Sequence, residues 1–187
     1  MVFDYSWLIG GPQGSGVDTA ANIFSRVGAK LGYHVFGKRE YHSNIKGLHS
    51  YFVVRLSRDN KVRSNVNGAN FMVAFDAETM IRHGLEILKD GAIIYDSSIV
   101  NTSIDEIPTI EVDHRVRLDE FFKSKNMEPK VSSIIELAKE SGVNVYPISF
   151  RDILSSIADE LERPELSRMT RMFNVLGVSF SLGVLKA

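Results

Sequence analysis

The hydrophobic and polar positions of this chain follow two patterns, short apolar runs and longer stretches with helical spacing. Short runs typical of strands occupy residues 6–9, 71–75, 92–95 and 143–146. Stretches with apolar residues every three or four positions predict helices at residues 17–31, 77–88, 118–125, 131–141, 151–161 and 165–185. Strands that alternate with helices at this spacing predict a sheet rich in parallel strands, with helices on both faces.

The region between the first helix and the second apolar run follows a different pattern. Strands are predicted there at residues 33–37 and 50–56, with a possible further strand at residues 61–66. Outside this region, residues 109–112 could form another strand. The turn residues Asp59 and Asn60 indicate that part of this region pairs in the antiparallel direction. The predicted fold is therefore α/β: a single three-layer, Rossmann-like domain of residues 1–187. Its sheet is mixed and mostly parallel, with an antiparallel hairpin.

Charge is distributed unevenly along a chain that is close to neutral overall. The 187 residues carry a net charge of −1. Between Lys38 and Arg63, however, seven Lys or Arg residues stand against two acidic residues, a local charge of +5. This segment either attracts anions or keeps an exposed sheet edge from pairing with another chain.

Composition excludes several kinds of chemistry. The chain contains no cysteine, so disulfides, thiol catalysis and cysteine-ligated iron–sulfur clusters cannot reside in it. No segment approaches the roughly 20 apolar residues of a membrane helix. The first residues also lack the basic start and apolar run of a signal peptide. We therefore expect a cytoplasmic protein without a membrane partner.

A glycine-rich turn, here called the glycine turn, follows the first predicted strand and includes Gly11, Gln13, Gly14 and Gly16. Such a turn at the start of a helix presents backbone N–H groups to an anion, or it permits a close backbone crossing. It does not match the dinucleotide fingerprint, because Thr19 stands where a third glycine or alanine is needed. No Gly-Lys-Ser/Thr follows, so it is not a P-loop either. Contact with a ligand or partner and a purely structural role stay open.

A second polar segment follows the second predicted strand and contains His42, Ser43, Asn44, Lys46, Gly47 and His49. We call residues 43–47 the 43–47 loop. Lys46 could hold a phosphate or carboxylate as a point charge, and Ser43 and Asn44 could donate hydrogen bonds to a substrate oxygen. No carboxylate is spaced to complete a metal triad with the two histidines, so we expect both to be surface or partly packed residues.

Two acidic residues stand directly after predicted strands. Asp76 follows residues 71–75, and Asp96 follows residues 92–95. Both positions could face a ligand at the carboxyl edge of the sheet, beside the glycine turn. We favour local roles, in which Asp76 caps the following helix and Asp96 begins a turn.

Two N-terminal segments together resemble a known family. They are WLIGGPQGSGVD at residues 7–18 and GKREYHSNIKG at residues 37–47, and MFNVLG at residues 172–177 adds a third similarity. They resemble the gamma domain of 2-oxoacid:ferredoxin oxidoreductases, in the form that precedes the pyrimidine-binding domain in the fused alpha subunit of archaeal enzymes. The similarity covers essentially the whole chain. The fused subunit continues well beyond this length, which leaves a separate subunit and an excised domain as alternatives.

The resemblance implies a gamma domain or subunit of a complex that oxidatively decarboxylates a 2-oxoacid to its acyl-CoA and reduces ferredoxin. It implies CoA as a co-substrate. It also implies that partner alpha and beta domains or subunits hold thiamine diphosphate, Mg²⁺ and the iron–sulfur cluster. This chain alone is then expected to bind none of these cofactors or metals and to carry no catalytic residue. The 43–47 loop would lie near the entrance for substrate and CoA, and the glycine turn would be structural or interfacial.

The residues are also compatible with two other classes of function. A stand-alone NAD- or FAD-binding Rossmann-like enzyme would use the glycine turn, with Glu40 as the acid that binds the ribose. A nucleic-acid-binding module would use the basic segment, but the slightly negative net charge and the lack of an aromatic stacking pattern disfavour it. We therefore expect no nucleic acid partner.

Overall fold

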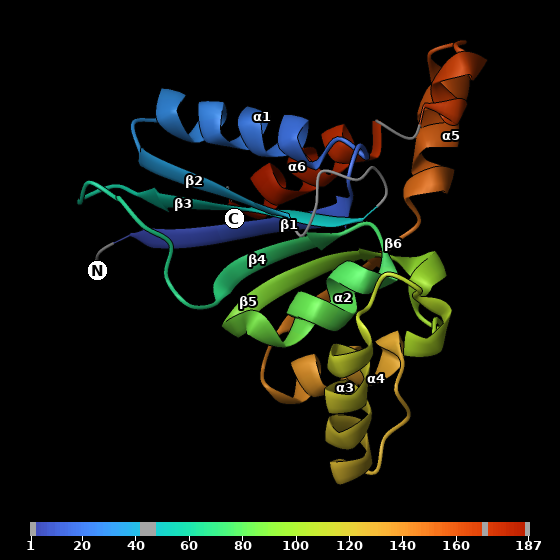
Figure 1. Ribbon diagram of the computed structural model, residues 1–187. Coiled ribbons are helices and arrows are strands. Elements are labelled where there is room, and N and C mark those ends of the chain that lie inside the picture. The colour runs from blue at the N-terminus through green and yellow to red at the C-terminus, as the bar shows by residue number, and fades with distance from the viewer. Residues whose placement is uncertain (1–2, 42–47, 170–171, 186–187) are drawn as a thin grey trace.

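A computed structural model describes residues 3–41, 48–169 and 172–185. These residues form one sheet of six strands in the order β2-β3-β1-β4-β5-β6, with helices on both faces (Figure 1). The strands are β1 (Asp4–Pro12), β2 (His34–Tyr41), β3 (His49–Ser57), β4 (Ala69–Ala74), β5 (Ile87–Asp96) and β6 (Asn144–Ile148). The helices are α1 (Val17–Lys30), α2 (Ala77–His83), α3 (Val112–Ser124), α4 (Val131–Glu140), α5 (Phe150–Glu160) and α6 (Met172–Leu185). The predicted α/β class is confirmed.

The sheet is mixed because one strand runs against its neighbours. β1 pairs in parallel with β4, β4 with β5, and β5 with β6. β3 lies between β1 and β2 and is antiparallel to both. The sheet therefore contains an antiparallel hairpin, but β2 and β3 form it, whereas the sequence placed it at residues 50–56 and 61–66 across Asp59 and Asn60. The prediction of a mixed, mostly parallel sheet is confirmed.

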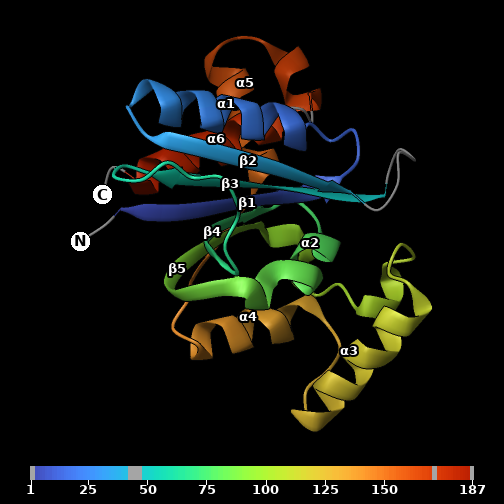
Figure 2. The same ribbon diagram turned by 60° about the vertical axis from the view of Figure 1, so that its left-hand side comes forward.

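Helices cover both faces of the sheet (Figures 1 and 2), and an apolar core lies between the sheet and the helices on each face. On the first face, α1 and α6 pack on Trp7, whose ring stacks on Phe24 with centroids 4.3 Å apart. The Trp7 indole N–H donates to Ser181 Oγ at 2.8 Å, which joins α6 to β1. On the second face, α2 and α4 pack over Met72 and Ile93. Burial of these side chains from water is the main force that holds the layers together.

Two predicted strands are wrong, for one topological reason. Residues 61–66 connect β3 to β4 without forming a strand, because both sides of β3 are already paired. Residues 109–112 form no strand either, and Val112 begins α3. α3 therefore starts before the predicted helix of residues 118–125. β5, the strand that precedes residues 109–112 in the chain, is already paired with β4 and β6.

Two predicted helices have different bounds. α2 ends at His83, and a 3-10 turn (Gly84–Glu86) leads straight into β5, so the helix predicted for residues 77–88 is too long. The helix predicted for residues 165–185 is divided into a 3-10 turn (Pro164–Arg168) and α6. Within the described residues, no helix combines the length and apolar character that crossing a membrane requires.

The parallel strands bring their carboxyl ends to one edge of the sheet. Gly10 of β1 is paired with Ala74 of β4, which is paired with Tyr95 of β5. The glycine turn, Asp76 and Asp96 follow these three strands, so the expectation that they share one edge is confirmed. In α/β sheets this edge is the usual position of a ligand site.

Candidate functional site at the carboxyl edge of the sheet

The glycine turn is closely packed against the C-terminal helix. Gly14 and Gly16 have φ angles of 91° and 99°, a backbone conformation that favours glycine. The buried Asn174 of α6 donates from Nδ2 to the carbonyl oxygen of Ser15 at 2.5 Å. A Cβ at Gly16 would lie 2.3 Å from that same Nδ2 atom. The turn thus permits a close helix crossing, which supports the structural role over a ligand cradle.

The glycine turn also braces the start of β3. The backbone N–H of Gln13 donates to the carbonyl oxygen of Leu48 at 2.7 Å. In the β1–β3 pairing, Pro12 lies opposite His49. Leu48 is the first described residue after the 43–47 loop, so the glycine turn helps to fix one end of the segment that carries the loop.

The loop residues that the sequence singles out, Ser43, Asn44, Lys46 and Gly47, lie outside the described residues. Their flanks are described. β2 ends at Tyr41, which is paired with Ser50 of β3. Both flanks lie at the carboxyl edge, because β2 runs in the same direction as β1 and β3 returns from that edge.

The position of Glu40 disfavours a dinucleotide site. β3 separates β2 from β1, so the glycine turn and the end of β2 are not on neighbouring strands. Glu40 is paired with Tyr51, which packs on the α2 and α4 face, whereas α1 lies on the opposite face. Glu40 forms an ion pair with Lys38. An acid on the face away from α1 does not complete a ribose site for the glycine turn.

A cleft of about 450 Å³ opens beside the start of β3. We call it the His49 cleft, and its lining residues are Leu48, His49, Glu78, Arg82, Pro108, Thr109, Ile110, Glu111 and Val112. They come from β3, from α2 and from the segment that leads into α3. The cleft therefore lies directly next to the described end of the 43–47 loop.

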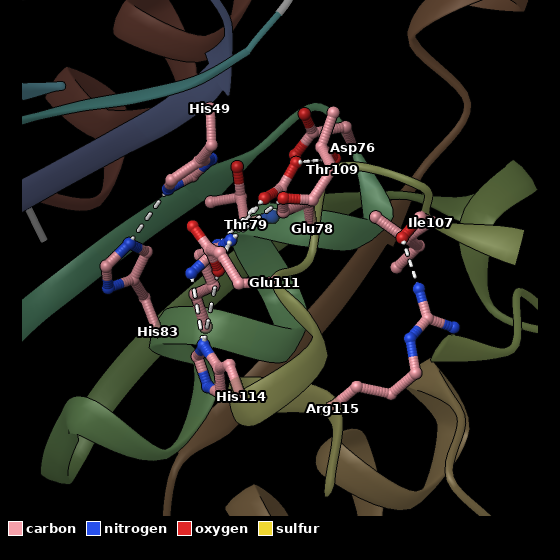
Figure 3. A network of polar contacts seen from close by, with 11 residues as sticks. His49, Asp76, Glu78, Thr79, His83, Ile107, Thr109, Glu111, His114 and Arg115 are labelled. Atoms are coloured by element: carbon pink, nitrogen blue, oxygen red, sulfur yellow. Dashed lines mark hydrogen bonds and ion pairs between the residues drawn. The ribbon is translucent and has the colours of Figure 1, made fainter. Parts of the chain in front are cut away.

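A charged network built on Arg82 forms one wall of the His49 cleft. The Arg82 side chain is only 7% exposed; its Nε donates to Glu78 at 2.8 Å and its Nη2 to Glu111 at 2.9 Å. Nη1 lies 3.1 Å from His114 Nδ1, and the Thr109 hydroxyl donates to Glu78 at 2.5 Å. Figure 3 shows Glu78, Thr109, Glu111 and His114 converging around this network. Because two carboxylates surround one guanidinium, the network joins the segment before α3 to α2 and is not arranged to bind an anion.

Two histidines meet behind the same cleft. Nε2 of His49 lies 3.0 Å from Nε2 of His83, and the two side chains face each other in Figure 3. His83 Nδ1 lies 3.0 Å from Glu86 Oε2. The Tyr51 ring packs against His83 with centroids 4.3 Å apart. Since His49 and His83 are 2% and 6% exposed, the expectation that His49 is a surface or partly packed residue is wrong.

The acids at the strand ends have local roles, as predicted. Asp76 accepts a hydrogen bond from the N–H of Thr79 at 2.8 Å and caps α2. Loss of hydration raises the pKa of the Asp76 carboxyl, and the bond from Thr79 opposes that effect. Asp96 accepts from the N–H of Ser98 at 2.9 Å and begins a 3-10 turn. Within the described residues, no group of three or more His, Asp or Glu side chains is arranged to hold a metal ion.

The partners of His49 and Glu78 could not be read from the sequence. His83 is 34 residues from His49, and Thr109 is 31 residues from Glu78. Only the packing of α2 against the sheet and of the segment before α3 brings them together. A helix that carries Glu78, Arg82 and His83 signals a polar face, but it does not indicate which residues it meets.

The fold and the carboxyl-edge site define an α/β domain with a mixed, mostly parallel sheet. The chain matches the family model described as pyruvate ferredoxin/flavodoxin oxidoreductase over residues 6–187. It is 40% identical over 180 residues to the alpha subunit of 2-oxoacid:ferredoxin oxidoreductase 1 from Sulfurisphaera tokodaii. It is also 40% identical over 181 residues to the corresponding subunit from Saccharolobus solfataricus. The chain belongs to the pyruvate ferredoxin/flavodoxin oxidoreductase family.

These relatives are much longer than the chain. The two matches cover 96% of this chain but only 28% of each relative. The subunit from Aeropyrum pernix, at 34% identity, shows the same proportion: 97% of this chain and 28% of the relative. The chain therefore corresponds to about a quarter of the length of these alpha subunits.

Solved structures share the fold. A 2-oxoglutarate:ferredoxin oxidoreductase from Magnetococcus marinus, with 2-oxoglutarate, coenzyme A and succinyl-CoA bound, matches 91% of this chain and 22% of its own. Its TM-score is 0.57 at 20% identity. The gamma subunit of a keto/oxoacid ferredoxin oxidoreductase from Geobacter sulfurreducens matches 96% of this chain and 99% of its own, with a TM-score of 0.51 and 11% identity. At these identities the likeness concerns the fold alone.

Proposed function

We propose that this chain is a single gamma-type domain, residues 1–187, of a 2-oxoacid:ferredoxin oxidoreductase. The complex would decarboxylate a 2-oxoacid oxidatively, form an acyl-CoA and reduce ferredoxin in the cytoplasm. The observation that carries the proposal is the 40% identity over 96% of the chain to alpha subunits of such enzymes. The role of this domain is to shape the entrance for CoA and substrate and to hold neighbouring domains or subunits together.

The carboxyl edge of the sheet supports an entrance role for the 43–47 loop. β2 ends and β3 begins at this edge, and the hydrogen bond from Gln13 to Leu48 fixes the C-terminal flank of the loop. Lys46 supplies a positive charge for a CoA phosphate or a substrate carboxylate, and Ser43 and Asn44 supply polar contacts.

The cofactors of the reaction belong to partner domains or subunits in this proposal. Iron–sulfur clusters are held by cysteine thiolates, and this chain has no cysteine. The chain also lacks the Gly-Asp-Gly segment typical of a site for thiamine diphosphate and Mg²⁺. Thiamine diphosphate-binding alpha and beta domains are the direct partners, and ferredoxin receives electrons through the complex.

The test is the substitution Lys46→Ala in the enzyme assembled from this chain and its thiamine diphosphate-binding partners. Loss of one charge-assisted contact is expected to raise the KM for CoA about 5- to 30-fold with little change in kcat. Ferredoxin reduction at varied CoA and varied 2-oxoacid separates the two ligands.

Lys61→Ala is the matched control for that substitution. Lys61 is exposed and follows β3, whose last residue is paired with Asp4 at the opposite edge of the sheet. Its substitution is expected to leave both Michaelis constants unchanged. If Lys46→Ala also left both constants unchanged, the entrance role of the loop would be wrong.

A further inference from the structure

A pocket of about 400 Å³ opens where β1 begins and β3 ends, and we call it the amino-edge pocket. Its lining includes Phe24 of α1 and Leu56 of β3, which are buried, and Leu182 of α6. In Figure 2 the end of α1 and the start of β1 lie on the same side of the molecule. The pocket therefore lies at the opposite edge of the sheet from the His49 cleft.

Aliphatic and aromatic side chains, together with Gly28, make up the lining of the amino-edge pocket. Gly28 lets α1 approach β3 closely, because a Cβ at that position would lie 2.7 Å from Leu56 Cδ2. Leu31, directly after α1, lines the pocket and is still 68% exposed, so part of the apolar lining is open to water. A pocket of this size and lining is typical of sites that bind small organic molecules.

The side chain of Arg58 points to the face of the sheet that carries this pocket. Arg58 continues the pairing of β1 with β3, since its backbone N–H donates to the carbonyl oxygen of Phe3 at 3.2 Å. Residues that lie opposite each other in an antiparallel pair point to the same face of the sheet. Phe3 packs on the apolar core between the sheet and the helices α1 and α6, so Arg58 is on that face as well.

Two aromatic side chains hold the Arg58 guanidinium beside the pocket. Its Cζ atom lies 5.3 Å from the ring centre of Tyr33 and 5.8 Å from that of Phe3, and Nη2 donates to the Tyr33 hydroxyl at 2.9 Å. Both rings line the pocket. Within the described residues, Arg58 forms no ion pair with a carboxylate. An oriented cation therefore stands next to an apolar pocket.

We propose that the amino-edge pocket binds a small amphipathic carboxylate, with its apolar body in the pocket and its carboxylate on Arg58. The lining disfavours a ligand that is polar throughout, because its polar groups would lose water without gaining partners. The planar guanidinium matches the geometry of a carboxylate and favours an anion at this side of the pocket. The proposal goes beyond the proposed function and does not depend on the entrance role of the 43–47 loop.

Calorimetric titration of the 187-residue chain with hexanoate, octanoate and decanoate tests the apolar part of the site. Each methylene group that leaves water is expected to strengthen binding about fourfold, so decanoate should bind roughly 200-fold more tightly than hexanoate. We expect one molecule of decanoate per chain. Absence of binding at about 1 mM decanoate, or an affinity that does not depend on chain length, would overturn the proposal.

Val27→Phe tests the position of the site, because Val27 lines the pocket and the added ring occupies part of it. Affinity for decanoate should fall at least about tenfold. Val116→Phe is the matched control: Val116 is 51% exposed on α3, which packs on the other face of the sheet, and the affinity should not change. If Val27→Phe does not fold, Leu31→Glu places a charge in the exposed part of the lining and should weaken binding as much. A folded variant that binds like the parent would contradict the assigned position.

Arg58→Gln tests the recognition of the carboxylate, with octanoate compared against the uncharged 1-octanol. Because Arg58 is exposed, loss of its charge should weaken octanoate binding only about three- to fivefold and leave octanol binding unchanged. Arg117→Gln, at an exposed position on α3, is the matched control and should change neither affinity. Equal losses for both ligands would show that Arg58 only supports the pocket, and the carboxylate preference would be wrong.

The same octanoate titration on the enzyme assembled with its thiamine diphosphate-binding partners tests the site in the complex. The assembled Val27→Phe enzyme is the blank, because it subtracts binding to the partners. We expect the affinity to stay within about twofold of that of the chain alone. Binding to the chain but not to the complex would mean that a partner covers the pocket, and the proposal would be overturned. Neither result affects the KM for CoA of Lys46→Ala, so the proposed function is tested separately.

Discussion

Removal of the Arg82 guanidinium breaks a buried charged network and is expected to destabilise the fold. In Arg82→Met the side chain keeps its apolar stem, but Glu78 loses its ion pair at 2.8 Å and Glu111 its pair at 2.9 Å. The Glu78 side chain is 7% exposed, so water cannot replace the lost partner, whereas the Glu111 side chain, at 52% exposure, regains water readily. The effect therefore comes mainly from one buried carboxylate, which keeps the hydrogen bond from Thr109.

The size of the expected loss of stability follows from the difference in exposure between Glu78 and Glu111. A buried ion pair that loses one member costs about 3–5 kcal/mol, because an uncompensated charge remains buried. The hydrogen bond from Thr109 to Glu78 and the recovered hydration of Glu111 reduce this, so we expect a loss of about 3 kcal/mol. The double variant Arg82→Met with Glu78→Gln removes the stranded charge and should recover at least about 1 kcal/mol of the loss.

Urea unfolding of the purified chain at neutral pH measures these differences. Arg163→Met is the matched control, since Arg163 pairs with Glu165 at 3.4 Å and both side chains are more than half exposed. Such a surface pair contributes about 0–1 kcal/mol. If Arg82→Met destabilised the chain no more than Arg163→Met, the reasoning about the buried network would be refuted.

Two further substitutions test the carboxyl edge by urea unfolding. Gly16→Ala should cost about 2–3 kcal/mol, because φ is 99° and the new Cβ would lie 2.3 Å from Asn174 Nδ2. Gly32→Ala, at φ 86° with nothing within 4 Å, should cost only about 1 kcal/mol, and equal losses would contradict this account. Asp76→Asn keeps a capping oxygen but removes a carboxylate whose pKa is raised in the fold. The ionised carboxylate destabilises the fold above its unfolded pKa of about 3.9 and not below, so the gain from Asn should grow from about pH 3 to pH 7. A gain that shrank over this range would count against the assigned cause.

The sequence predicts the centre of the fold well because burial leaves a strong pattern there. β1, β4 and β5 are apolar over residues that are buried on both faces of the sheet, so their runs predict parallel strands. α1 shows a single apolar face that contacts the sheet, and Asp76 stands directly before the helix that it caps. These signals are local, and they can be read without knowledge of the tertiary structure.

The errors arise where non-local pairing decides the structure. Residues 61–66 have a sequence compatible with a strand, but β3 has no free side to pair with them. His83, which meets His49, and Glu111, which meets Arg82, come from segments about 30 residues away, so no local pattern connects them. Lys46 and its neighbours in the 43–47 loop were singled out by their residue types, and the family resemblance assigned them to the entrance for substrate and CoA; their role stays a prediction.

The central claim is that this domain completes a reaction centre that its partners build. The most direct measurement is ferredoxin reduction dependent on 2-oxoacid and CoA, with this chain alone, with the thiamine diphosphate-binding partner chains alone, and with both together. The account predicts full turnover only for the combined proteins, and a raised KM for CoA when the combination carries Lys46→Ala. Turnover by the isolated chain, or equal turnover by the partners without it, would contradict the account.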